Sequence, residues 1–190
     1  MKRASIVGKI MSWIDYKFFY RDPLFRPLSL KRIVEMIDNR ADLVLDVKQP
    51  GIEDKLLDFL RDTGFHRTVY ISSEFHQVIK NVKTLDKKVL TIAPINIMPV
   101  DIVGLVKRAE ADYASIHVSL IDEKIVRELH NEDIGVLVWT VNDVKQILTL
   151  LDMNVDGIVT DRPDVALATL RIWKNNIPLR NSYNPITKPN

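Results

Sequence analysis

Short runs of β-branched and aliphatic residues recur along the chain, and each run starts 21 to 25 residues after the previous one. The six runs are Leu43–Lys48, Thr68–Ser73, Val89–Pro94, Tyr113–Ser119, Gly135–Asn142 and Asp156–Asp161. Between several of them, apolar residues return every three or four positions, as in an amphipathic helix. An interval of this length holds a strand, a helix of about ten residues and two loops, so the pattern predicts a βα repeat and a parallel sheet.

The predicted helices and the length of the chain together indicate how many βα units the fold contains. The predicted helices are Leu30–Ile37, Ile52–Arg61, Val100–Ala109, Asp122–His130, Asp143–Leu151 and Val165–Trp173. Asn142 and Asp161 stand at strand ends, where helix N-caps belong. A closed barrel of eight βα units usually takes about 250 residues. The 190 residues therefore indicate an α/β fold of about six parallel strands, arranged as an incomplete barrel or as an open sheet.

The two ends of the chain differ from the repeat. Residues 1–26 contain an apolar stripe at helical spacing, formed by Ile6, Ile10, Trp13, Ile14 and Phe18. Five basic side chains and one acid accompany it in residues 1–21. This favours an amphipathic helix that covers an exposed end or side of the sheet. A partner-binding helix and an interfacial membrane helix are the alternatives. Residues 174–190 are rich in Pro and Asn, so we divide the chain into an extension (1–26), a domain (27–173) and a tail (174–190).

Composition excludes several classes of function. The chain has no cysteine, which rules out a disulfide scaffold, a zinc–thiolate site and a cysteine nucleophile. Its formal charge of +2 is too small to indicate a nucleic-acid partner. The sequence also lacks a membrane-length apolar run and a signal-peptide pattern at its start. We therefore expect a cytoplasmic protein.

Two motifs stand close together between Gly135 and Val165. They read Trp-Thr-Val-Asn at 139–142 and Val-Asp-Gly-Ile-Val-Thr-Asp-Arg-Pro at 155–163. Both resemble the last two βα units of the glycerophosphodiester phosphodiesterase family. Upstream, Pro27–Leu30, Leu43–Lys48 and Val69–Ser73 resemble the segments around that family's third and fourth strands. The resemblance covers roughly residues 27–168 and implies an incomplete TIM-barrel-like fold that lacks the first two βα units.

The same resemblance shows which chemical groups are absent. In the family, His-Arg-Gly, Glu-Asn-Thr, Glu-x-Asp and a His-Asp pair supply two acid/base histidines, a phosphate-binding arginine and two metal-binding carboxylates. None of these motifs precedes Pro27. The dipeptide His66-Arg67 comes before its strand, whereas active sites of barrels lie at the C-terminal strand ends. We expect no catalytic role for it.

Three residues stand at positions that the family uses for binding. Asp46 takes the place of a metal-binding glutamate, Lys48 that of a phosphate-contacting lysine and Trp139 that of a pocket-wall tryptophan. Strand parity puts Val44, Asp46 and Lys48 on one face. A solvated ion pair is the alternative for Asp46 and Lys48, and a core aromatic is the alternative for Trp139. Because a lone carboxylate holds Mg²⁺ or Ca²⁺ poorly, we expect no cofactor unless the protein is active, when a divalent cation is implied.

The histidines complete the set of candidates. His117 and His76 follow strands at their C-terminal ends and are the candidate acid/base residues, or are uninvolved. His130 stands at a helix C-terminus and is expected to interact with the helix dipole.

We expect a phosphodiesterase-like protein that has lost catalysis and is kept for binding or structure, with a phosphate-containing small molecule or a second copy of the chain as partner. One alternative is an active phosphodiesterase with a rebuilt site made of Asp46, Lys48, His76, His117 and Trp139. The other is a membrane-surface or regulatory protein that uses the basic N-terminal segment.

Overall fold

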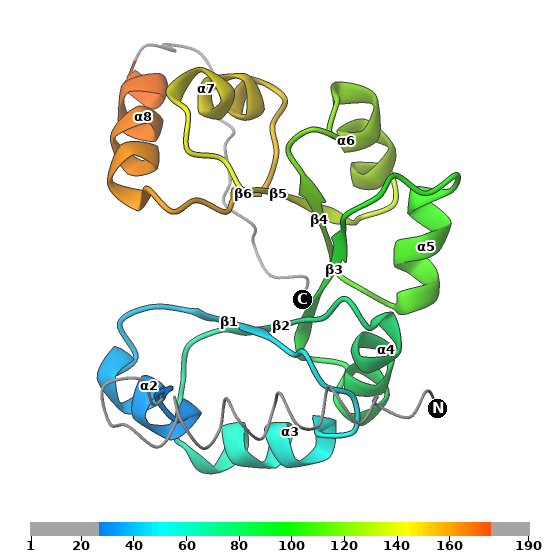
Figure 1. Cartoon of the computed structure of the whole chain (residues 1–190), viewed down its shortest axis with the longest axis vertical. Helices are drawn as coiled ribbons and strands as arrows, with labels where there is room; N and C mark the ends of the chain where they lie inside the picture. Colours follow the sequence, from blue (N-terminus) through cyan, green and yellow to red (C-terminus); the bar gives the residue numbers. More distant parts are fainter. Residues whose placement is uncertain (1–26, 176–190) are drawn as a thin grey trace, which may run out of the picture.

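Six parallel strands form one sheet in sequence order in the computed structural model, which describes residues 27–175 (Figure 1). The strands are β1 (Leu43–Asp46), β2 (Val69–Ser72), β3 (Leu90–Ile95), β4 (Tyr113–His117), β5 (Gly135–Trp139) and β6 (Gly157–Ile158). The helices are α2 (Leu30–Ile37), α3 (Glu53–Asp62), α4 (His76–Leu85), α5 (Ile102–Ala109), α6 (Glu123–His130), α7 (Val144–Asp152) and α8 (Pro163–Asn175). The predicted βα repeat is confirmed. The predicted extension at 1–26 lies outside the described residues, as does most of the predicted tail.

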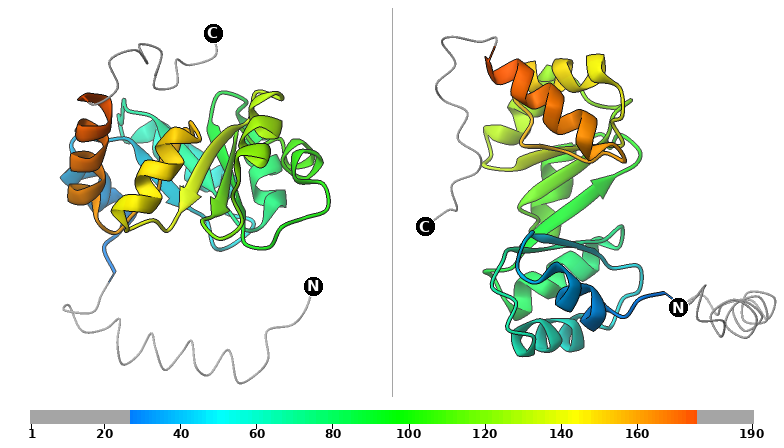
Figure 2. Two further views of the ribbon diagram at one scale, coloured as in Figure 1. Left: turned by 90° about the horizontal axis from the view of Figure 1, so that it is seen from above. Right: turned by 90° about the vertical axis from the view of Figure 1, so that its left-hand side faces the viewer.

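The sheet is curled, with its helices on the convex side (Figures 1 and 2). β1 and β6 lie at the two ends of the curve, and each pairs with a single strand among residues 27–175. This curvature distinguishes an incomplete barrel from a flat open sheet, so the incomplete TIM-barrel-like fold is confirmed. The concave side of the sheet is the side that faces the interior in a closed barrel.

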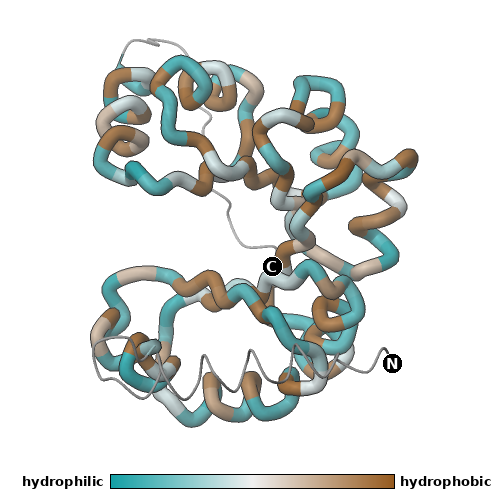
Figure 3. The backbone as a smooth tube through the Cα atoms, in the orientation of Figure 1, coloured by the Kyte–Doolittle hydropathy of each residue, from teal (hydrophilic) through white to brown (hydrophobic). Residues whose placement is uncertain are grey.

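The core lies between the sheet and its outer helices. Strand residues that point toward the helices are fully buried, among them Ile71, Ala114, Ile116, Val136 and Val138. Figure 3 shows hydrophobic and hydrophilic segments alternating around the helices, as expected when one side of each helix packs on the sheet. On the concave side, the register places Val44 beside Tyr70 and His117 beside Trp139. These four side chains therefore share the concave face.

Two predicted helix N-caps differ from those in the structure. The N-cap of α7 is Asp143, whose carboxylate accepts from the backbone N–H groups of Lys145 and Gln146 at 3.0 and 3.1 Å. α8 begins at Pro163, a residue suited to the first helical position. The predictions that Asn142 and Asp161 are N-caps are therefore wrong. These two side chains bind each other instead, with Asn142 Nδ2 donating to Asp161 Oδ2 at 3.0 Å.

Candidate functional site

The first group of polar side chains lies where β1 and β2 end. Lys48 Nζ is 2.8 Å from Asp46 Oδ2 and 3.5 Å from Glu74 Oε1. The hydrogen bond to Asp46, together with the charges of both carboxylates, raises the pKa of Lys48, although its partial desolvation acts in the opposite direction. All three side chains are exposed, at 62%, 46% and 52% for Lys48, Asp46 and Glu74. The group is thus a solvated cation held between two carboxylates from neighbouring strands.

The second group lies where β4 and β5 end. The rings of His117 and Trp139 meet edge to face, with centroids 5.0 Å apart and planes at 82°. Trp139 Nε1 donates to the backbone oxygen of Ser115 at 3.0 Å. The indole is therefore held in one orientation by a neighbouring strand, and it fixes the imidazole beside it.

Hydrogen bonds define the tautomer of His117. The backbone N–H of Ser119 donates to His117 Nδ1 at 3.3 Å, and Ser119 Oγ lies 2.8 Å from the same nitrogen. A backbone N–H can only donate, so Nδ1 is an acceptor and the neutral ring carries its proton on Nε2. In this state His117 offers a hydrogen-bond donor to a ligand, and its basic nitrogen is already occupied.

The other histidines do not join this group. His76 is the first residue of α4, and its Nε2 is 3.4 Å from the backbone oxygen of Pro94. His66 precedes β2, as the sequence indicates, and its backbone N–H donates to Asn39 Oδ1 at 2.7 Å. His130 ends α6, and its Nε2 lies 2.8 Å from Asp156 Oδ2 just before β6. The sequence predicts the position of His130 at a helix end but not this carboxylate partner.

β2 and β3 lie between β1, which carries Asp46, and β4, which carries His117. Neighbouring strands in a sheet lie about 4.8 Å apart, so three steps from β1 to β4 amount to roughly 14 Å along the curved sheet. Within residues 27–175, no hydrogen bond or ion pair joins the Asp46–Lys48 group to the His117–Trp139 group. The same part of the chain contains no cluster of three His, Asp or Glu side chains suited to a metal ion.

Two tyrosines on the concave face were missed by the sequence analysis. The rings of Tyr70 and Tyr113 meet edge to face with centroids 5.8 Å apart. Burial raises the pKa of Tyr113 to about 12, with smaller contributions from Tyr70, Asp156 and Asp112. Burial also raises the pKa of Tyr70, and Asp42 adds to the effect. Strand parity could have found Tyr113, which lies four residues before His117 on β4 and therefore shares its face.

No helix within residues 27–175 is long and apolar enough to cross a membrane. The predicted amphipathic segment in residues 1–26 is not among the helices to which this finding applies.

The model of the glycerophosphoryl diester phosphodiesterase family matches residues 30–165. A glycerophosphodiester phosphodiesterase of Bacillus altitudinis is 27% identical over 149 residues, which cover 73% of this chain and 60% of the relative. One from Caldanaerobacter subterraneus is 25% identical over 150 residues, covering 75% of this chain and 61% of the relative. The chain thus spans about three fifths of the length of these curated relatives.

Solved structures share the fold. A protein from Parabacteroides distasonis described as a glycerophosphodiester phosphodiesterase has a TM-score of 0.68 at 16% identity, covering 92% of this chain and 77% of that one. An Oleispira antarctica phosphodiesterase in complex with the product sn-glycerol-3-phosphate has a TM-score of 0.66 at 19% identity, covering 75% of this chain and 60% of that one. At these identities the likeness concerns the fold.

Proposed function

The chain belongs to the glycerophosphoryl diester phosphodiesterase family, and we propose that its 190 residues bind a phosphate-bearing small molecule without hydrolysing it. The observation that carries the proposal is the separation of the polar side chains at the strand ends into two groups. One group holds the cation of Lys48 between Asp46 and Glu74. The other holds His117 on β4 and Trp139 on β5, and β3 lies between the two groups.

Phosphodiester hydrolysis needs several chemical groups at one site, and the two groups of side chains do not supply them together. It needs a base to activate the nucleophile, an acid to protonate the leaving oxygen and a cation to stabilise the phosphoryl charge. Nδ1 of His117 is already engaged by Ser119. His76 lies against the Pro94 carbonyl. Among residues 27–175, the strand ends therefore offer a cation and hydrogen-bond donors to a ligand, but no paired acid and base.

Enzymes of this family generally use divalent cations, so we tested whether the described residues fit one. Mg²⁺ and Ca²⁺ need several oxygen ligands held around one point. Asp46 and Glu74 both contact Lys48, whose ammonium takes the place that a metal ion would need. The two carboxylates do not fit a resident cation, and we assign none.

Binding of a phosphate ester has support from the donors that remain. Lys48 supplies a full positive charge and N–H donors that are exposed to solvent, so a phosphate group can contact it directly. The Oleispira antarctica protein, which shares the fold, is described with sn-glycerol-3-phosphate bound. A phosphate monoester of a small polyol is therefore the ligand class that we propose.

The test measures turnover and binding separately. We expect no release of glycerol 3-phosphate from glycerophosphocholine above background with Mg²⁺ or Ca²⁺. We expect weak binding of sn-glycerol 3-phosphate by calorimetry or NMR titration, and Lys48→Ala should weaken it about three- to tenfold because a charged hydrogen bond is lost. The matched control is Lys55→Ala, which removes an exposed lysine of α3 and should leave binding unchanged.

Turnover would favour the alternative, an active phosphodiesterase with a rebuilt site. The position of Asp46, Lys48 and His117 at the same end of the sheet is the observation in its favour. If Asp46→Ala and Lys48→Ala each abolish measurable hydrolysis, the non-catalytic proposal is wrong. His117→Gln and His76→Gln would then identify the acid and the base.

A further inference from the structure

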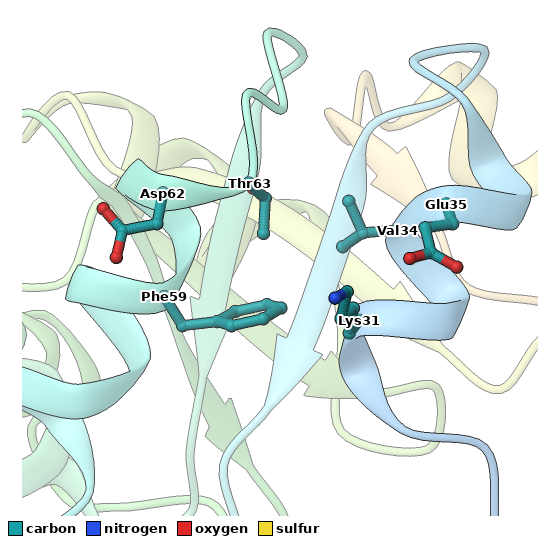
Figure 4. Close-up of a pocket in the computed structure, with 6 residues that line it drawn as sticks. All are labelled: Lys31, Val34, Glu35, Phe59, Asp62 and Thr63. Atoms are coloured by element: carbon teal, nitrogen blue, oxygen red, sulfur yellow. The ribbon is translucent and has the colours of Figure 1, made fainter.

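A groove lies between α2 and α3 (Figure 4), and both helices are on the outer surface close to β1 at the edge of the sheet (Figure 1). Its volume is about 310 Å³, and it is lined by Lys31, Val34, Glu35, Phe59, Asp62 and Thr63. Figure 4 shows the Phe59 ring extending from α3 toward α2, with Val34 on the opposite wall. The floor is therefore apolar, and charged side chains stand around it.

The apolar side of α2 is only partly buried. Val34 is its single buried residue, at 8% exposed, whereas Leu30, Ile33 and Ile37 are half-buried. Met36 is 51% exposed. An amphipathic helix normally buries such a stripe against a neighbour, so apolar surface remains here for another segment to cover.

We propose that the apolar stripe of the chain's own N-terminal extension, residues 1–26, docks in this groove. The first reason is the tether. The described chain begins at Pro27, three residues before α2, and eleven residues separate Phe18 from Leu30. Eleven residues can span up to about 35 Å, whereas an eight-residue helix is about 12 Å long. The stripe can therefore reach every part of the groove.

The second reason is charge. Residues 1–26 carry six basic and two acidic side chains, a formal charge of +4. α3 carries four acidic and two basic side chains, a formal charge of −2. Glu35 and Asp62 are exposed at the groove, where Lys31 is the one cation among the lining residues. A basic amphipathic segment matches this surface, whereas an anionic membrane would be repelled by its carboxylates.

This inference does not depend on the proposed ligand binding. The groove lies between two helices on the convex side, and Asp46, Lys48, His117 and Trp139 lie at strand ends. Loss of phosphate binding would leave the docking of residues 1–26 unaffected. Failure of docking would likewise leave the strand-end residues in place.

The experiment uses the full chain, which has no cysteine of its own. Met11→Cys, beside the stripe, is combined with Thr63→Cys in the groove, and the pair is treated with a short bis-maleimide. The control combines Met11→Cys with Arg61→Cys. Arg61 is two residues away on the side of α3 nearer α4, with its Nη2 3.8 Å from Asp86 Oδ2. Circular dichroism of both variants checks that the fold is kept.

We expect intramolecular crosslinking to Cys at position 63 to be at least about tenfold faster than at position 61, because docking raises the local concentration at one face. Adding Glu35→Lys and Asp62→Lys should slow it about two- to fivefold, since each exposed ion pair contributes modestly. Adding Lys17→Glu and Arg21→Glu to that variant should restore the rate.

Three results would overturn the proposal. Equal rates at positions 61 and 63 would mean that the segment has no preferred site on α3. Crosslinks formed only between chains would make a second copy the occupant. Co-sedimentation of the native chain with vesicles of phosphatidylcholine and phosphatidylserine, lost on deletion of residues 1–21 and unaffected by Glu35→Lys and Asp62→Lys, would make a membrane surface the occupant.

Discussion

The strands β4 and β5 have a neighbour on each side, whereas β1 at the edge pairs with β2 alone among the described strands. Around β4 and β5, side chains on both faces are buried: Val138 is fully buried toward the helices, and Tyr113 is 5% exposed on the concave side. On β1, Val44 is 59% exposed on the concave side. The same βα unit therefore makes a packed core in the middle of the sheet and a solvated surface at its edge.

This difference decides where chemistry is available. The family motifs at 139–142 and 155–163 include the ends of β5 and β6, where the side chain of Asn142 binds Thr160 and Asp161 at the surface. The charged candidates Asp46 and Lys48 lie at the solvated edge. Ion pairs between solvent-exposed side chains contribute little to the free energy of unfolding. Asp46 and Lys48 can therefore exchange their contact with each other for a contact with a ligand at little cost in stability.

Two ion pairs give the largest expected contrast. Lys83 is a buried lysine whose Nζ lies 2.7 Å from Asp112 Oδ2 and donates to the Val89 carbonyl at 2.9 Å. Lys83→Ala leaves Asp112 without its counter-ion and should lower the free energy of unfolding by about 3–5 kcal/mol. Lys48→Ala breaks the exposed pair and should cost less than about 1 kcal/mol. Urea denaturation measures both, and equal effects would contradict the contrast.

A valine on each of the strands β5 and β1 allows the contribution of the two regions to stability to be compared directly. Val138 on β5 is fully buried, and Val44 on β1 is mostly exposed. Val138→Ala should destabilise the fold by about 2–3 kcal/mol through lost burial and the cavity left behind. Val44→Ala should change stability by less than about 0.5 kcal/mol. A large effect of Val44→Ala would show that the edge is covered in solution, by residues 1–26 or by a second copy.

Ionisation of Tyr113 and Tyr70 makes the stability of the fold depend on pH, and the two residues should differ in the size of this effect. Burial raises the pKa of Tyr113 to about 12, so the folded protein keeps its phenol neutral where the unfolded chain begins to ionise. This contribution is present below about pH 10 and is lost as pH rises to about 12, which amounts to about 2 kcal/mol. Tyr113→Phe should therefore flatten the loss of stability between these two pH values. Tyr70→Phe, nearer the edge, should reduce the pH dependence of stability less than Tyr113→Phe does. Thermal melts across this pH range measure both variants, and a larger effect of Tyr70→Phe would contradict the prediction.

A helix cap gives the smallest effect. Asp143 accepts two backbone N–H groups at the start of α7 in the packed half, whereas α3 near the edge has no side-chain cap. Asp143→Ala should lower the free energy of unfolding by about 1 kcal/mol. Asp54→Ala, in the first turn of α3, removes a carboxylate that makes no cap bond and should cost a few tenths of that value. Indistinguishable denaturation midpoints would contradict the assignment of Asp143 as the cap.

Local periodicity was sufficient for most of the fold. The positions of the six strands and the bounds of α2 follow from residues that alternate or repeat within a few positions. α4 was missed because its buried set, Val78, Ile79 and Val82, is β-branched and surrounded by polar residues, a weak helical signal. The N-cap of α7 was misplaced by one residue, because Asn142 and Asp143 are both good caps and backbone geometry alone selects between them.

Candidate residues could be found from the sequence, but their partners could not. Asp46 and Lys48 share a strand, so parity alone places them together. Glu74, the carboxylate that completes their group, comes from the end of another strand. Trp139 meets His117 through the register of β4 and β5, whereas Ser119 contacts the same ring from two residues further along the chain. Sequence determined which side chains reach the strand ends, because that depends on a period of two residues. Only the tertiary structure decided which of them meet, because this depends on the pairing and curvature of strands more than twenty residues apart.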